Sequence, residues 1–189
     1  MQPVELSEIK SVADYEIARD TLRPQILALK DRRRIHVGDH LTLLFENRET
    51  VRYQIQEMMR IERITKPSDI AHEVETYNEL IPAQGELCAS LLIEYETPAE
   101  RDVKLRELLG LEKHLWLEVP GAGRTCAIFD PRQIATDRIS SVQYIKFRMS
   151  DAQVKGFPSA AAIVCDHPAY TERRDLTRAE LDELTPDFA

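Results

Sequence analysis

The segment HLTLLFENRETVRYQIQEMMRIERI, from His40 to Ile64, decides what kind of fold this chain forms. Its first part places Leu41, Leu43 and Phe45 at every second position, which predicts a strand. Beyond Asn47, apolar residues recur every three or four positions, so we expect an amphipathic helix from about Glu49. A strand that is followed at once by a helix indicates a chain with both α and β elements.

The expected helix carries polar residues on its apolar side. On a helical wheel Glu62 falls near the middle of the apolar stripe, and Gln54 lies on its edge. A buried ionised carboxylate needs a cationic partner, several hydrogen-bond donors or a metal ion. Glu62 therefore either pairs with an inward Arg or a ligand, or reaches water because the helix frays before Pro67. Glu57 and Arg60, three positions apart, are expected to form a surface ion pair.

Size and composition predict one domain over residues 1–189, with an ordered core at about 8–170 and a C-terminal tail with a short helix at 171–189. The N-terminus has no basic start followed by an apolar run, and no apolar run approaches the roughly 20 residues of a membrane span. We therefore expect a cytoplasmic protein without a membrane segment. The net charge of −8 disfavours nucleic acid as a partner.

One short basic run departs from this acidic character. Residues 30–34, KDRRR, either contact an anion or form a solvated helix end that enters a strand. The three cysteines, Cys88, Cys126 and Cys165, are far apart and include no C-x-x-C pair. This spacing argues against a disulfide framework, a zinc ribbon and an iron–sulfur cassette, and it indicates buried thiols.

Strand and helix patterns alternate along the rest of the chain. Helical patterns cover residues 5–30 (with a break or a second start at Pro24), 68–81 (capped by Ser68), 98–109, a short stretch after Ser150 and one after Thr177. Strand patterns cover 33–37, 86–96, 114–119 with 124–129 as a hairpin, 141–149 and 160–165. Several neighbouring strands are joined by turns too short for a parallel crossover. The sequence thus predicts an α+β fold with a mixed or mostly antiparallel sheet flanked by helices.

Several polar residues are candidates for a common site. We consider Glu46, Arg52, Gln54 and Glu94 as ligand-binding residues and Glu57, Glu62 and His167 as catalytic acids or bases. Neighbouring carboxylates, Arg and His shift one another's pKa values, which suits proton transfer. The alternative is a structural ion-pair network, because such networks also shift pKa values.

A metal site is a further alternative. His167 and Cys165 project from the same face of the strand, and His167 with Glu62 is the candidate ligand pair. His36, His40 or His72 would complete a set of two His and one carboxylate, which holds iron and related divalent ions such as manganese or zinc.

Three segments resemble one protein family: HLTLLFENRETVRYQIQEMMRIER at 40–63, YNELIP at 77–82 and DHPAY at 166–170. Together they are similar to the bacterial DUF3501 family, and the likeness extends over most of residues 8–170. The resemblance implies no reaction and supplies no catalytic residue. It does imply a genomic neighbourhood with rubrerythrin and with iron–sulfur proteins like heterodisulfide reductase.

Two functions follow from these expectations. The first is an accessory or partner protein in bacterial redox or peroxide-stress metabolism, which acts with an iron–sulfur oxidoreductase or a protein of the rubrerythrin pathway. The alternative is a small enzyme, or a metal- or ligand-binding protein, with a pocket of Glu, Arg and His residues.

Overall fold

The strand and the helix predicted between His40 and Ile64 are both formed. In the computed structural model, β2 spans Leu41–Glu46 and α2 spans Arg48–Glu62. The side chain of Asn47 accepts hydrogen bonds from the backbone N–H groups of Glu49 and Thr50, both at 3.0 Å. This cap pairs two N–H groups that have no partner inside the helix, so the strand passes into the helix without a loop.

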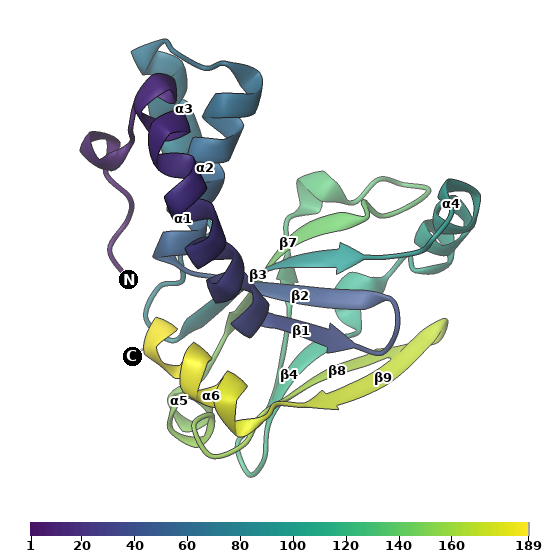
Figure 1. Cartoon of the computed structure of the whole chain (residues 1–189). Coiled ribbons are helices and arrows are strands. Elements are labelled where there is room, and N and C mark those ends of the chain that lie inside the picture. Colours follow the sequence, from purple (N-terminus) through teal and green to yellow (C-terminus); the bar gives the residue numbers. More distant parts are fainter. Residues whose placement is uncertain (189) are drawn as a thin grey trace.

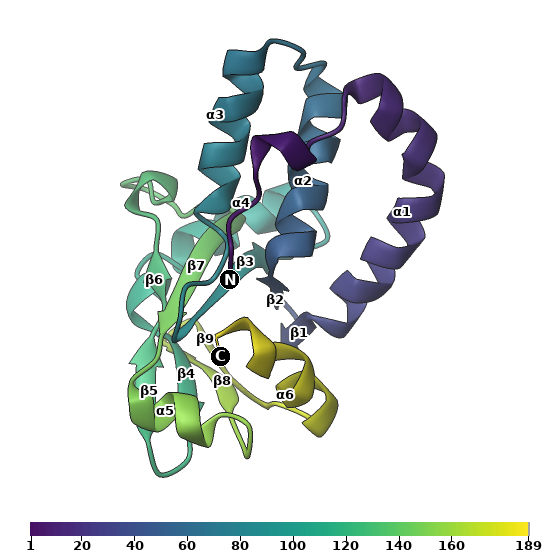
Figure 2. The ribbon, with the colours of Figure 1, turned by 90° about the vertical axis from the view of Figure 1, so that its left-hand side faces the viewer.

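Three helices project from the sheets as an arm (Figures 1 and 2). The structure describes residues 1–188, and within them this helical arm consists of α1 (Val12–Arg32), α2 and α3 (Pro67–Asn78), with the short turn η1 (Leu6–Glu8) against α3. The arm has an apolar cluster of its own, which comprises Val4, Val51, Ile55, Met59, Val74, Leu80 and Ile81. The arm is therefore held together by side chains that do not belong to the main core.

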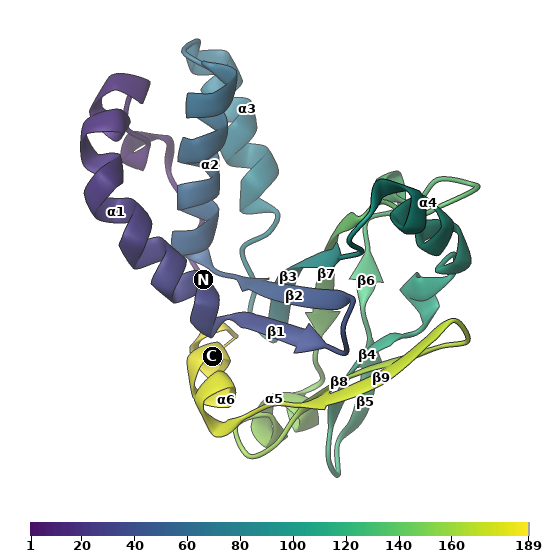
Figure 3. The same cartoon turned by 45° about the vertical axis from the view of Figure 1, so that its right-hand side comes forward.

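All of the strands in the described fold belong to two antiparallel sheets (Figure 3). One sheet has the strand order β1-β2-β3-β7-β6, and the other has the order β5-β4-β8-β9. The remaining strand bounds are β1 (Arg34–Val37), β3 (Glu86–Ile93), β4 (Leu115–Val119), β5 (Gly123–Cys126), β6 (Ile128–Phe129), β7 (Val142–Arg148), β8 (Ala162–His167) and β9 (Tyr170–Asp175). The predicted α+β class is confirmed, with two sheets that are antiparallel throughout.

The main hydrophobic core joins the two sheets. Leu43, Leu91 and Ile145 from one sheet and Leu117 and Ile163 from the other belong to one buried cluster. The helices α4 (Pro98–Glu107), α5 (Asp151–Gly156) and α6 (Arg178–Leu184) lie around it. Because side chains alternate along a strand, the other face of β2 carries Thr42, Leu44 and Glu46 away from this core. That face meets the helical arm, and it is where the candidate site lies.

Two expectations about the helices are wrong. Pro24 does not break α1, which continues through it. A proline removes only one helical hydrogen bond, and Asp20, whose carbonyl loses its donor, is exposed to water. Ser68 does not cap α3: the helix begins one residue earlier, after Lys66, with Pro67 in its first turn. Proline fits that position because the first N–H groups have no helical partner.

Two expectations about the strands also need correction. The stretch 124–129 is not one strand, because β5 ends at Cys126 and β6 joins the other sheet beside β7. At the break, the N–H of Ala127 donates to the carbonyl of Leu115 at 2.8 Å. The strand β9 was not expected, whereas the short helix expected in the C-terminal stretch is formed as α6. Leu181, Leu184 and Phe188 of this stretch belong to the main core.

No helix among residues 1–188 combines the length and apolar character that crossing a membrane requires.

Candidate functional site

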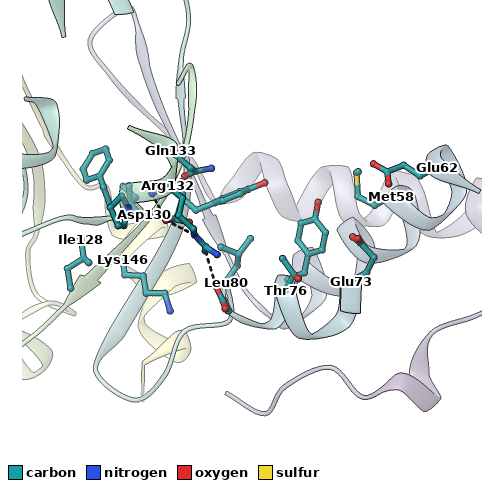
Figure 4. A pocket seen from close by; sticks show the side chains of 16 residues that line it. Met58, Glu62, Glu73, Thr76, Leu80, Ile128, Asp130, Arg132, Gln133 and Lys146 are labelled. Carbon is teal, nitrogen blue, oxygen red and sulfur yellow. Dashed lines mark hydrogen bonds and ion pairs between the residues drawn. The ribbon is translucent and has the colours of Figure 1, made fainter. Parts of the chain in front are cut away.

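A groove of about 560 Å³ lies where the helical arm meets the edge of the five-stranded sheet (Figure 4). We call it the arm groove. Its apolar and aromatic residues come from α2, from α3 and the segment after it, and from β6 and β7: Met58, Tyr77, Leu80, Ile128, Phe129, Tyr144 and Ile145. Its size and lining are typical of protein sites that bind a ligand or the side chains of a partner.

The charged residues of the arm groove fall into two groups. Arg132 pairs with Asp130 at 2.7 Å and with Glu79 at 3.6 Å, so these charges are already compensated. The Arg132 guanidinium also lowers the pKa of Asp130. By contrast, within residues 1–188 the charged groups of Glu62, Glu73 and Lys146 have no ion-pair partner within 4.0 Å. Figure 4 shows Glu62 and Glu73 toward one end of the groove and Lys146 at the other.

A second cavity, of about 200 Å³, lies beside the arm groove. We call it the inner cavity. Its polar lining residues are Lys30, Glu46, Gln54 and Ser90, and its apolar ones are Leu44, Val51, Leu92 and Val142. Tyr77, Leu80 and Tyr144 line both the inner cavity and the arm groove. These three side chains therefore lie between the two spaces.

The structure brings two of the four predicted ligand-binding residues together. Glu46 and Gln54 both line the inner cavity. Arg52 lies elsewhere: it pairs with Glu49 and lines a separate pocket between α1 and α2. Glu94 follows the end of β3, where it is exposed and accepts a hydrogen bond from the Thr42 hydroxyl. In the β2–β3 register Glu46 lies opposite Cys88, whereas Glu94 follows Ile93, which lies opposite Leu41, so the two acids lie at opposite ends of these strands.

Glu57 belongs to a network between α1 and α2. Arg19 pairs with it at 2.7 Å, the Tyr15 hydroxyl donates to it at 2.6 Å, and Arg60 donates to it at 3.3 Å. Burial raises the pKa of Glu57, but the hydrogen bonds from Arg19 and Tyr15 outweigh it and hold the pKa at about 2. A carboxylate held ionised in this way is poorly suited to carry a proton near neutral pH. The expected pair with Arg60 is confirmed, within a larger network.

Glu62 is the last residue of α2, and it is exposed. Arg63 follows it in the left-handed conformation and ends the helix. The expected pairing of Glu62 with an inward Arg is not formed, because the helix ends before that part of its surface meets a neighbour. A role for Glu62 in binding stays a prediction, now at the end of the arm groove.

His167 is buried, and both of its ring nitrogens have partners. Nε2 lies 3.1 Å from the Leu109 carbonyl, and Nδ1 accepts from the Ala169 N–H at 3.1 Å. The ring also packs edge-on against His114. The Cys165 thiol donates to the Tyr170 carbonyl at 3.2 Å, and burial raises the pKa of Cys165 to about 11. Both side chains are thus committed to contacts that hold the end of β8 and the turn after it.

The candidate metal ligands are not brought together. Glu62 ends α2 in the arm, whereas His167 ends β8 in the four-stranded sheet (Figure 1). His36 contacts Thr42, His40 stacks on Tyr95, and His72 is exposed on α3. Across residues 1–188, no three side chains of His, Cys, Asp or Glu are placed to hold a metal ion.

Sequence analysis missed the buried role of the basic run. Arg33 is 1% exposed and pairs with Asp187, and Lys30 lines the inner cavity. The interpretation of this run as a solvated helix end is wrong for Arg33. Strand parity contained the signal, because Arg33 is two and four positions before the core residues Ile35 and Val37.

The chain is similar to one known protein family and to a solved structure. Residues 3–188 match the family described as "Protein of unknown function (DUF3501)". A crystal structure of a novel protein of unknown function from Burkholderia pseudomallei K96243 is 30% identical, with 100% of both chains covered and a TM-score of 0.93. No curated protein matches the chain.

Proposed function

The chain belongs to the DUF3501 family, proteins of unknown function, and from this premise we propose that it is an accessory protein that holds a segment of a partner protein in the arm groove. The observation that carries the proposal is the groove itself, which combines an apolar floor with uncompensated charges toward its two ends. Partner segments are recognised in this way: apolar side chains supply affinity, and charges at the rim fix their orientation.

The charges define the segment that fits. Glu62 and Glu73 attract a basic residue, and Lys146 attracts an acidic one. Between them, Met58, Leu80 and Phe129 offer an apolar surface. We therefore propose a short segment with apolar side chains in its middle, a Lys or Arg toward α2 and α3, and an Asp or Glu toward β7.

The class of partner comes from the family resemblance. The genomic neighbourhood that it implies makes an iron–sulfur oxidoreductase, or a protein of the rubrerythrin pathway, the partner that we propose. The protein would then act in redox or peroxide-stress metabolism in the bacterial cytoplasm. Its role would be to bind and position the oxidoreductase, which carries the electron-transfer groups.

Titration calorimetry with a purified partner tests the proposal. The partner is an iron–sulfur oxidoreductase of the class that the family resemblance implies, taken from the same bacterium. The full chain is compared with its variants Ile128→Asp and Lys146→Glu. Ile128 is 48% exposed at the rim of the groove, so a charge there disturbs binding before it disturbs folding. We expect each substitution to weaken binding about tenfold or more, which is about 1.4 kcal/mol.

Val103→Asp is the matched control. Val103 is 52% exposed on α4, slightly more than Ile128, and it does not line the arm groove. We expect the Val103→Asp variant to bind the partner with the same affinity as the unchanged protein. Equal affinity of all variants, or no binding by the unchanged protein, would refute the proposal.

Elemental analysis separates this proposal from the metal-binding alternative. For protein purified without oxygen or chelator, the accessory function predicts iron, manganese and zinc far below one ion per chain. A stoichiometric metal ion would instead favour the alternative and make His167 and Glu62 the first residues to replace.

A further inference from the structure

Glu46 is a buried acid without a cationic partner. It is 6% exposed, and its carboxylate accepts hydrogen bonds from the hydroxyls of Thr50 and Ser90, the latter at 2.7 Å. Within residues 1–188, no Lys, Arg or His side-chain nitrogen lies within 4.0 Å of this carboxylate. An ionised carboxylate accepts about four hydrogen bonds, so about two acceptor positions remain. A buried charge in this state favours the binding of a cation.

The lining of the inner cavity also includes a basic residue. Lys30, near the end of α1, lines the same space, and its Nζ atom lies 5.4 Å from the centre of the Tyr53 ring. No carboxylate lies within 4.0 Å of this atom among residues 1–188. The lining thus includes one acidic residue and one basic residue that are not paired with each other.

The remaining lining sets the size and polarity of what fits. The volume of about 200 Å³ equals that of about six or seven water molecules in the liquid. Leu44, Val51 and Leu92 give the cavity an apolar wall, and Gln54 adds an amide that both donates and accepts hydrogen bonds. A small molecule with both charges and a short aliphatic part matches all of these features.

We propose that the inner cavity binds a small aliphatic α-amino acid. Its ammonium group pairs with Glu46, its carboxylate pairs with Lys30, and its side chain packs on the wall formed by Leu44, Val51 and Leu92. This site is distinct from the docking of a partner in the arm groove, and it does not depend on that function.

Titration calorimetry with three matched compounds tests the proposal on the full chain. L-valine carries both charges, isobutylamine lacks the carboxylate, and isovalerate lacks the ammonium group. We expect L-valine to bind at least tenfold more tightly than either analogue, because each analogue leaves either Glu46 or Lys30 without its partner charge. Equal binding of isobutylamine and L-valine, or no binding of L-valine at millimolar concentrations, would overturn the proposal.

Substitutions locate the binding at the inner cavity. We expect Glu46→Gln and Lys30→Met each to weaken L-valine binding at least tenfold. Lys30 is only half-buried, so Lys30→Met keeps the test valid even if Glu46→Gln fails to fold. Glu94→Gln is the control, because Glu94 also accepts a threonine hydroxyl but lines a different pocket. Unchanged L-valine affinity in Lys30→Met, with the fold intact by circular dichroism, would contradict the proposal.

Discussion

Arg33 shows how much of this fold depends on single buried charges. Its guanidinium donates to the backbone carbonyls of Phe45 and Glu46, at 2.9 Å and 3.3 Å, and pairs with Asp187. Burial raises the pKa of Asp187 to about 6, although the Arg33 guanidinium opposes that rise. The pair connects the C-terminal segment to the end of β2, next to the inner cavity. Removing Arg33 would leave Asp187 buried without its cationic partner, whereas removing Asp187 would leave Arg33 paired with Glu183 at 3.3 Å.

At the same scale, Glu57→Gln is expected to destabilise the protein by about 1–2 kcal/mol at pH 7, after allowance for solvent screening. Hydrogen bonds from Arg19 and Tyr15 lower the pKa of Glu57 from 4.5 to about 2. The stability that this depressed pKa supplies is therefore complete above pH 4.5 and is lost as the pH falls towards 2. Urea unfolding of both proteins at pH 7 and at pH 3 measures this contribution to stability.

The difference in the free energy of unfolding between Glu57→Gln and the unchanged protein should be smaller at pH 3 than at pH 7. Glu75→Gln, an exposed acid on α3, is the control and should change stability little at either pH. A difference that stays constant between pH 7 and pH 3 would rule out this account of the α1–α2 network.

Among the elements, α2 determines where both cavities lie. It begins directly after β2, so the outward face of the strand and the inward face of the helix meet within one turn. Thr50 of its first turn donates to Glu46, Gln54 lines the inner cavity, and Met58 lines the arm groove. These positions are four residues apart, which places them along one side of the helix. The start of α2 therefore fixes the geometry of both spaces.

Asn47→Ala tests this role of the helix start. It removes the acceptor for two N–H groups of the first turn, and we expect it to destabilise the protein by about 1 kcal/mol. Ser68→Ala is the control, because Ser68 lies at the start of α3 but does not cap it. Thermal and urea unfolding should show a loss of stability for Asn47→Ala and almost no loss for Ser68→Ala. Equal losses would mean that the cap of α2 is not what stabilises its start.

On the scale of the whole molecule, Tyr170 joins the two sheets. Its hydroxyl donates to the Val37 carbonyl at 2.7 Å and accepts from the His40 N–H at 3.0 Å. Gly38, between these residues, has a φ of 64°, and a Cβ atom there would lie 2.3 Å from the Tyr170 hydroxyl oxygen. The β1–β2 turn and β9 thus approach each other more closely than any residue with a side chain at position 38 allows.

Gly38→Ala is therefore expected to destabilise the protein more than Gly121→Ala does. Both glycines have positive φ, but a Cβ atom at Gly121 meets nothing within 4 Å. Both substitutions introduce the same kind of backbone strain. The difference in the free energy of unfolding between the two variants therefore measures the clash with β9, and we expect it to be about 1–3 kcal/mol. Urea unfolding of both variants gives this difference. Equal destabilisation would show that the sheets move apart at little cost.

Much of the local structure was determined by the sequence. Alternation predicted β2 and β7, and a nearly continuous apolar run predicted β3. The capping residues Thr97, Ser150 and Thr177 marked the starts of α4, α5 and α6, and short turns predicted antiparallel pairing. These features depend on residues that are close along the chain, so their periodicity and hydrogen-bonding groups are visible in it. The pairing of Glu57 with Arg60 was predictable for the same reason.

Only the tertiary structure decided which distant residues meet. Nothing local shows that Arg33 lies against Asp187, that His167 has both nitrogens occupied, or that Ile128 leaves one sheet for the other. The same holds for the two cavities, where Lys30, Glu46 and Ser90 come from three separate elements. Charges are compensated by whatever lies within a few ångströms in space, and the packing of the helical arm on the sheet sets those distances.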